Sequence, residues 1–175
     1  MVNIVLIEPE IPQNTGNIAR TCAALGAVLH LVHPLGFSLD DRQLKRAGLD
    51  YWHMLTVRQW KSFPEFLDAV SPGQCWFFTT KAQSLYCEAQ YGNDPYLIFG
   101  RESAGLPEEI LVLNPARCLR IPMLEGARSL NLSNSVAIAA YEYERQNGFT
   151  GLQASGNLHR LSWPNPTIAS QEGIA

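Results

Sequence analysis

Short apolar runs alternate along the chain with segments whose apolar residues recur at helical spacing. The apolar runs are residues 2–7, 28–32, 54–57, 74–78, 96–99 and 117–121. Runs without polar alternation are typical of strands that are buried on both faces of a parallel sheet. The helical patterns between them lie at residues 14–25, 38–48, 63–70, 108–113 and 136–143. This alternation predicts one α/β domain with a mostly parallel sheet flanked by helices.

Polar caps and a glycine mark the ends of the first and last predicted helices. Asn14 or Thr15 is the expected N-cap of the first helix, and Gly26 is its expected end. Ser133 or Asn134 is the expected N-cap of the last helix. Residues 84–94 are polar without a clear period, so no element is predicted there.

Three polar loops follow predicted strands, at residues 14–20, 100–105 and 126–135. The carboxyl ends of parallel strands meet at one edge of the sheet, where open α/β folds bind ligands. Asn17 and Arg20 are three residues apart, so they share one face of the first helical turns. An alternative interpretation is equally open: the start of this helix only caps itself, and Arg20 is a solvated surface charge.

Two glycines, Gly100 and Gly105, stand at the two ends of the second loop. Glycine permits a close approach between the backbone and a ligand, so both are expected at a binding site. The spacing matches neither a dinucleotide-binding fingerprint nor a Walker phosphate loop. Thr79 follows another predicted strand, where a small hydroxyl side chain can line a ligand crevice or simply end the strand.

A basic face is predicted on the helix at residues 38–48. Arg42, Lys45 and Arg46 lie at spacings of three and four, and aromatic residues follow at 51–53. Such a patch can contact a nucleic-acid backbone and stack a base. A solvated helix end beside core aromatic residues is the alternative.

Composition limits the class of protein. The chain has 175 residues with a net charge of −3, which suits one domain and argues against a broad electrostatic grip on nucleic acid. Residues 1–150 are the expected domain, and residues 151–175 are a tail rich in small and polar residues. The first apolar run ends at Glu8, and no run is long enough to span a bilayer. The four cysteines are far apart. We expect a cytoplasmic protein without a signal peptide, a membrane span or a metal site.

Three stretches together closely resemble the three motifs of the SPOUT RNA methyltransferases. They are EPEIPQNTGNIARTCAALG (residues 8–26), LIFGRESAGLP (97–107) and IPMLEGARSLNLSNSVAIAAYE (121–142). More narrowly, the chain is similar to the small tRNA 2′-O-methyltransferases of the TrmL (YibK-like) group over residues 1–148. It departs from that group at Arg101, where some relatives carry proline, and in its longer tail.

The resemblance implies a SPOUT fold with a deep C-terminal trefoil knot and an obligate homodimer that packs its first and last helices together. It also implies S-adenosyl-L-methionine as the cofactor and tRNA as the substrate. The implied reaction transfers a methyl group to the ribose 2′-hydroxyl of a tRNA nucleotide, the wobble cytidine or a modified uridine. Which tRNAs are modified does not follow from the sequence.

Residue by residue, the resemblance places five positions at the cofactor: Phe78, Gly100, Ile121, Ser129 and Leu130. Thr79 and Gly105 join them from the residue pattern alone. The implied catalytic set is Arg20, Asn17, Glu102, Ser129, Asn131 and Tyr141. Tyr141 can reach the site within its own chain or from across the dimer.

Arg20 has two possible roles in this catalytic set. The family assignment makes Arg20 the general base. Asn17 is expected to position Arg20 or the ribose, and Glu102 to hold Arg20 across the crevice. Free arginine is essentially always protonated, so stabilisation of the developing alkoxide is the physically preferred role. Ser129 and Asn131 complete the acceptor pocket in either case.

Two other classes of protein are weighed against this interpretation. The first is an RNA-binding module on the same fold without catalytic activity, which should have lost affinity for the methyl donor. The second is a nucleotide-dependent α/β enzyme of ordinary topology, which the missing phosphate-binding motifs disfavour.

Overall fold

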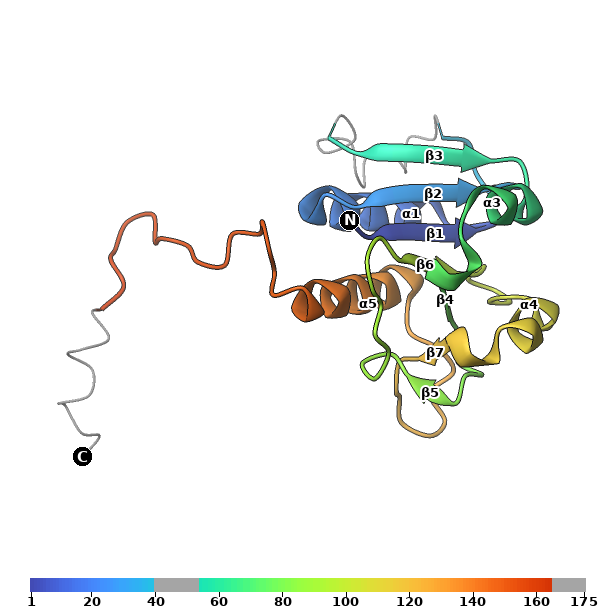
Figure 1. Ribbon diagram of the computed structural model, residues 1–175. Coiled ribbons are helices and arrows are strands. Elements are labelled where there is room, and N and C mark those ends of the chain that lie inside the picture. The colour runs from blue at the N-terminus through green and yellow to red at the C-terminus, as the bar shows by residue number, and fades with distance from the viewer. Residues whose placement is uncertain (40–53, 165–175) are drawn as a thin grey trace.

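The computed structural model describes residues 1–39 and 54–164, and this part of the chain contains a seven-stranded, all-parallel sheet (Figure 1). The strands are β1 (Asn3–Ile7), β2 (Val28–Val32), β3 (Thr56–Trp60), β4 (Cys75–Phe78), β5 (Ser84–Leu85), β6 (Tyr96–Phe99) and β7 (Cys118–Arg120). Their order across the sheet is β3-β2-β1-β6-β4-β7-β5, and every neighbouring pair is parallel. The predicted α/β class with a parallel sheet is therefore confirmed, whereas the trefoil knot stays a prediction.

Helices cover both faces of the sheet. The described α-helices are α1 (Pro12–Leu25), α3 (Phe63–Ala69), α4 (Glu108–Leu113) and α5 (Leu132–Gln146), and two 3₁₀ turns are η1 (Pro72–Gln74) and η2 (Pro115–Arg117). The helix expected at 38–48 falls almost entirely outside the described residues, and its basic residues Arg42, Lys45 and Arg46 lie there too.

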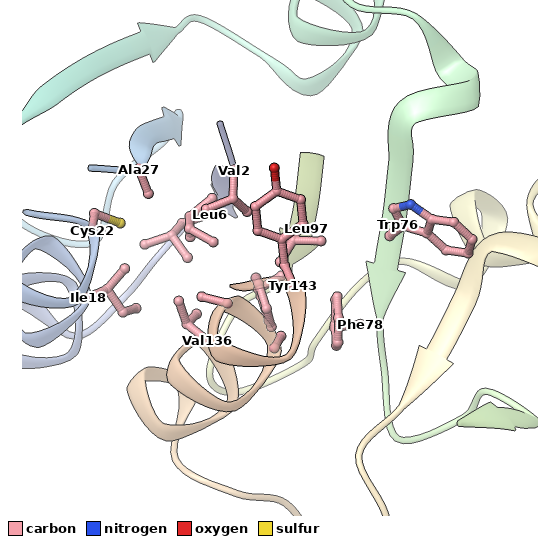
Figure 2. Packing of buried hydrophobic residues seen from close by; sticks show 14 of the residues in the cluster. Val2, Leu6, Ile18, Cys22, Ala27, Trp76, Phe78, Leu97, Val136 and Tyr143 are labelled. Atoms are coloured by element: carbon pink, nitrogen blue, oxygen red, sulfur yellow. The ribbon is translucent and has the colours of Figure 1, made fainter. Parts of the chain in front are cut away.

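Two separate hydrophobic clusters show which helices cover which face. The larger cluster joins β1, β2, β4 and β6 to α1 and α5, and Figure 2 shows Ile18 and Val136 from these helices beside Leu6 and Leu97 of the sheet. The smaller cluster lies on the opposite face, where Phe66 of α3 packs with the strands. Burial of large apolar side chains contributes about 1.5–3 kcal/mol each, so both faces hold the sheet in place.

The N-cap predictions are wrong by three or four residues for α1 and by two or three residues for α5. Helix α1 begins at Pro12 with Ile11 as its N-cap, because proline fits the first helical position, where no N–H is needed. Helix α5 is capped by Asn131, whose side-chain oxygen accepts a hydrogen bond from the Ser133 N–H. Gly26 does end α1, in the left-handed conformation expected of a C-terminal glycine.

Two strands differ from the sequence pattern. The edge strand β3 begins at Thr56 rather than at residue 54, and it keeps polar residues on its exposed side. The two-residue strand β5 lies in the segment for which no element was predicted, and it forms the other edge beside β7. Both are edge strands, which bury little surface and therefore leave a weak pattern.

The chain after α5 leads away from the domain (Figure 1). Its described residues 151–164 contain no helix or strand, and Leu161 and Trp163 are exposed. Within residues 1–39 and 54–164, no helix has the length and apolar character that a bilayer crossing requires.

Candidate active site

A cleft of about 560 Å³ opens beside the carboxyl ends of β4, β6 and β7. Its size lies within the range typical of small-molecule sites. Its lining comes from three regions far apart in the sequence: Ile11 and Asn14 near the start of α1, residues 99–106 after β6, and the segment from Leu119 to Ser135 that leads into α5. The loop at residues 78–81 completes the lining.

Aromatic side chains supply an apolar part of the cleft wall. Phe78 ends β4 and Phe99 ends β6, and their rings stack with centroids 4.7 Å apart. Ile121 and Leu130 add aliphatic surface to the same lining. This arrangement suits a ligand with a flat, weakly polar ring system.

A chain of side-chain hydrogen bonds connects the three regions of the cleft. The Asn14 amide nitrogen donates to Glu102 Oε1 at 3.0 Å, and the Asn131 amide nitrogen donates to Asn14 Oδ1 at 2.9 Å. Asn131 Oδ1 accepts from the Ser133 N–H at 2.9 Å and from its hydroxyl at 2.6 Å. Because a carboxylate only accepts hydrogen bonds, the orientation of both amides is fixed along the whole chain.

Glu102 also holds the entry to helix α1. Its Oε2 accepts from the Glu10 N–H at 2.9 Å, and its Oε1 accepts from the Ile11 N–H at 3.3 Å. The carboxylate therefore fixes the two residues that precede α1 from a loop about ninety residues later, near the positive end of the helix. The sequence pattern instead predicted that Asn14 or Thr15 would fix the start of this helix.

The loop after β6 is a tight turn closed on itself. The Gly105 N–H donates to the Arg101 carbonyl at 2.8 Å, and Gly105 has a positive φ of 69°. A Cβ on Gly100 would lie 2.1 Å from the Gly105 carbonyl carbon. Both glycines line the cleft, but the close approach at Gly100 is to this loop itself rather than to a ligand.

Residues 8–10 hold the outer side of the same loop. The Arg101 guanidinium lies 3.2 Å from Glu8 Oε2, and Glu8 itself has a positive φ of 49°. Such a backbone conformation is uncommon for a residue other than glycine and tends to occur near functional sites. Two hydrogen bonds from Ser103 lower the pKa of Glu10.

At the rim of the cleft, Lys81 reaches the first turn of α4. Its Nζ lies 2.7 Å from Glu108 Oε1, and both side chains are exposed. The hydrogen bond from Lys81 and its positive charge lower the pKa of Glu108. This ion pair connects the loop after β4 to the start of α4.

The structure brings most of the predicted site residues together in this cleft. Those that line it are Phe78, Thr79, Gly100, Glu102, Gly105, Ile121, Ser129, Leu130 and Asn131. Three predicted catalytic residues do not line the cleft of their own chain: Asn17 and Arg20 are exposed on α1, and Tyr141 is 48% exposed on α5.

Sequence reasoning missed four residues of the site. Asn14 was placed in the first polar loop but given no role in the site, yet it connects Glu102 with Asn131. Lys81 and Arg128 line the cleft, and Glu10 binds its outer loop. A usable signal existed for Asn14, because it shares a polar loop with the predicted residues Asn17 and Arg20.

Metal ligands are absent from the part of the chain that the structure describes. Within it, no group of three or more histidine, cysteine, aspartate or glutamate side chains could hold a metal ion. Three of the four cysteines are buried as free thiols, and Cys87 is an exposed free thiol.

Known proteins similar to this chain cover nearly all of the described domain. The sequence model of the SpoU rRNA methylase family matches residues 1–141. The tRNA (cytidine(34)-2′-O)-methyltransferase of Aeromonas hydrophila is 49% identical over 152 residues, which are 86% of this chain and 97% of the relative. The enzyme of the same name from Escherichia coli K12 is 47% identical over 152 residues, with the same shares.

Solved structures resemble the whole fold. One, described as giving structural insights into the 2-OH methylation of C/U34 on tRNA, has 49% identity and a TM-score of 0.81, covering 85% of this chain and 97% of its own. An AdoMet-bound rRNA methyltransferase from Sinorhizobium meliloti has 26% identity and a TM-score of 0.74, covering 83% of this chain and 56% of its own.

Proposed function

The chain belongs to the SpoU rRNA methylase family, and from this premise we propose that it methylates the ribose 2′-hydroxyl of a tRNA nucleotide. The nucleotide is the wobble cytidine, position 34 in the names of the similar enzymes, or the uridine at that position, which the similar structure on C/U34 methylation adds. The observation that supports this most directly is the hydrogen-bonded chain Glu102–Asn14–Asn131, which joins all three motif segments around one cleft.

S-adenosyl-L-methionine is the methyl donor in this proposal, and the cleft fits it. The volume of about 560 Å³ suits a cofactor of this size, and Phe78 and Phe99, which are nearly buried and stack on each other, give the cleft an apolar base. Ile121 and Leu130 enclose the same space. When bound, the donor supplies an electrophilic methyl group on a sulfonium centre.

Glu102 and Asn14 are positioning residues in this proposal. The three hydrogen bonds that Glu102 accepts, from Glu10, Ile11 and Asn14, occupy both of its carboxylate oxygens. We therefore assign Glu102 the task of holding the loops in register, in place of holding Arg20. The hydrogen bond from Asn131 to Asn14 fixes the backbone around Asn131. This positions Ser129, two residues earlier, to contact the acceptor ribose.

Electrostatics and alignment supply the catalysis in this proposal. The lining of the cleft, as far as the structure describes the chain, contains no histidine that could act as a general base. Arg20 stabilises the negative charge that develops on the acceptor oxygen, because its guanidinium keeps its proton. Alignment of the reacting groups can contribute about 7–11 kcal/mol at best.

A homodimer completes the site in this proposal. Arg20 and Tyr141 are exposed on α1 and α5, the two helices that cover the same face of the sheet. We infer that a second copy packs against these helices and brings its own Arg20 and Tyr141 to the cleft. This arrangement explains why neither residue lines the cleft of a single chain.

Residues 1–150 form the methyltransferase domain in this proposal, and residues 151–175 are an appended tail. A cytoplasmic location follows from tRNA as the substrate. Basic residues Arg42, Lys45 and Arg46 remain candidates for contact with the RNA backbone.

The proposal is tested by incubating the purified protein with S-adenosyl-L-methionine and a tRNA transcript, then digesting the RNA and measuring 2′-O-methylated nucleosides by mass spectrometry. A 2′-O-methylated wobble nucleotide is the expected product. Calorimetric titration with the donor runs in parallel. If the protein binds RNA but neither binds the donor nor transfers a methyl group, it is an RNA-binding module on this fold.

A further inference from the structure

The basic side chains that line the cleft differ in whether an acidic side chain pairs with them. Three basic side chains line it: Lys81, Arg101 and Arg128. Lys81 pairs with Glu108 at 2.7 Å, and Arg101 pairs with Glu8 at 3.2 Å. Arg128 makes neither an ion pair nor a hydrogen bond with any residue at 1–39 or 54–164.

The place of Arg128 is set by its neighbours along the chain. It comes directly before Ser129, and Asn131 two residues later is tied to Asn14 at 2.9 Å. Arg128 is exposed and also lines the cleft, so its charge is accessible both to solvent and to a ligand there. An exposed cation therefore stands beside the residues assigned above to the acceptor ribose.

The chemistry of arginine limits what it can bind there. A guanidinium has five N–H donors and no acceptor, and its fork geometry matches the oxygens of a phosphate. Within residues 1–39 and 54–164, Glu102 is the only acidic residue of the cleft lining, and its oxygens already accept three hydrogen bonds. Among the residues that the structure describes, no acidic side chain of the lining is left to pair with Arg128, so its donors are open to a ligand.

We propose that Arg128 binds a backbone phosphate next to the ribose that receives the methyl group. This inference rests on the proposed function, because it requires an RNA acceptor at the mouth of the cleft. A chain with a net charge of −3 has little general attraction for RNA. One correctly placed arginine can then fix the register of the acceptor strand without reading its sequence.

The test compares Arg128→Ala and Arg128→Lys with the unaltered protein, using an anticodon stem–loop RNA with cytidine at the wobble position. RNA affinity is measured by fluorescence anisotropy over a series of salt concentrations, and donor affinity by calorimetry. Arg160→Ala is the matched control, because Arg160 is an exposed arginine of the tail.

Arg128→Ala should weaken RNA binding roughly ten- to a hundredfold, the effect of losing hydrogen bonds to a charged group. The slope of log affinity against log salt should fall by about one. Arg128→Lys should keep the slope but lose part of the affinity, since a lysine cannot bind both oxygens of one phosphate in the same plane. Donor affinity and the Arg160→Ala control should stay unchanged.

Unchanged RNA affinity in Arg128→Ala would overturn the proposal. So would a loss of donor affinity with intact RNA binding, which would assign Arg128 to the carboxylate of the donor instead. The proposed function fails separately, if the unaltered protein methylates no RNA at all.

Discussion

The carboxylate of Glu10 accepts two hydrogen bonds from Ser103, one from its backbone N–H at 2.9 Å and one from its hydroxyl at 2.7 Å. The backbone N–H of Glu10 donates in turn to Glu102 at 2.9 Å. The segment before α1 and the loop after β6 are thus joined in both directions. The shape of the cleft wall at residues 101–105 therefore depends on Glu10, which lies outside the cleft lining.

Glu10→Ala should weaken donor binding by roughly tenfold, because both contacts to Ser103 are lost and the loop is free to move. Glu10→Gln should have a smaller effect, since its amide oxygen can still accept one of the two hydrogen bonds. Calorimetric titration with S-adenosyl-L-methionine measures both. Glu109→Ala removes the same charge from an exposed position on α4 and should bind the donor normally. Equal donor affinity in Glu10→Ala and Glu109→Ala would contradict this role.

Gly100→Ala should abolish donor binding and destabilise the fold. The added methyl group would lie 2.1 Å from the Gly105 carbonyl carbon and 2.4 Å from the Leu106 nitrogen, so the backbone must move. Overpacking of this kind typically costs about 1–3 kcal/mol, and here it also displaces the cleft wall. Urea unfolding and donor titration report the two effects. Gly156→Ala, in open space on the tail, is the control.

Folding stability should fall as the pH drops from 7 to 5, because of His30. This histidine is fully buried; its Nδ1 accepts from the Trp60 indole N–H at 3.1 Å, so its Nε2–H donates to Asn3 Oδ1 at 3.2 Å. Burial, with the nearby charge of Arg58, lowers its pKa from 6.5 to about 4. The unfolded chain therefore binds more protons in this range, and the free energy of unfolding should drop by about 2 kcal/mol.

Urea unfolding at pH 7, 6 and 5 checks the effect of His30. In His30→Gln the drop with pH should be mostly absent, although this variant is less stable at every pH. His33→Gln changes a half-buried histidine that contacts Gln59 and should retain the full drop. A pH dependence that survives in His30→Gln would assign the titration to another group.

Thr15→Val should stabilise the protein. Thr15 is completely buried in α1, and its hydroxyl has no hydrogen-bond partner among the described residues. Replacing an unsatisfied buried hydroxyl with a methyl group of the same shape removes a cost of about 1–3 kcal/mol. Thermal unfolding measures the gain. Thr21→Val on the same helix is the counterpart, since the Thr21 hydroxyl bonds the Asn17 carbonyl and its loss should not stabilise.

Mixed dimers should recover activity from two inactive variants. Arg20→Ala and Glu102→Gln homodimers should both be inactive. If each cleft takes Glu102 from one subunit and Arg20 from the other, the heterodimer contains one intact site and should show about half of the unaltered turnover per dimer. Co-expression with two affinity tags isolates this species. No recovery in the heterodimer would place both residues in the same subunit's site.

The strands and their order of appearance could be predicted because each buried strand leaves a continuous apolar run. Val28–Val32 and Tyr96–Phe99 occur in the structure with the predicted bounds. The edge strands could not be placed as well, since β3 exposes polar side chains and β5 has only two residues. Neither edge strand buries enough surface to require a regular pattern of apolar residues in the sequence.

The candidate site was predictable as a set of loops but not as a network. The local pattern around Asn14 suits a helix cap, and nothing nearby shows that Glu102 and Asn131 would bind its amide. These contacts join residues 88 and 117 positions apart, beyond the reach of any local pattern. Arg128 was also missed. No local sequence pattern distinguishes it from a surface arginine, and it has no partner within the described chain.

Strand β1 pairs with β6 in the middle of the sheet, with Asn3 opposite Tyr96. During synthesis on the ribosome, the edge of β1 that pairs with β6 therefore stays unpaired until more than half of the polypeptide has emerged. Pairings of such long range slow folding, because a large loop must close first. The cleft can form only after Asn131 is synthesised, so nascent chains cannot engage a ligand there until translation is nearly finished.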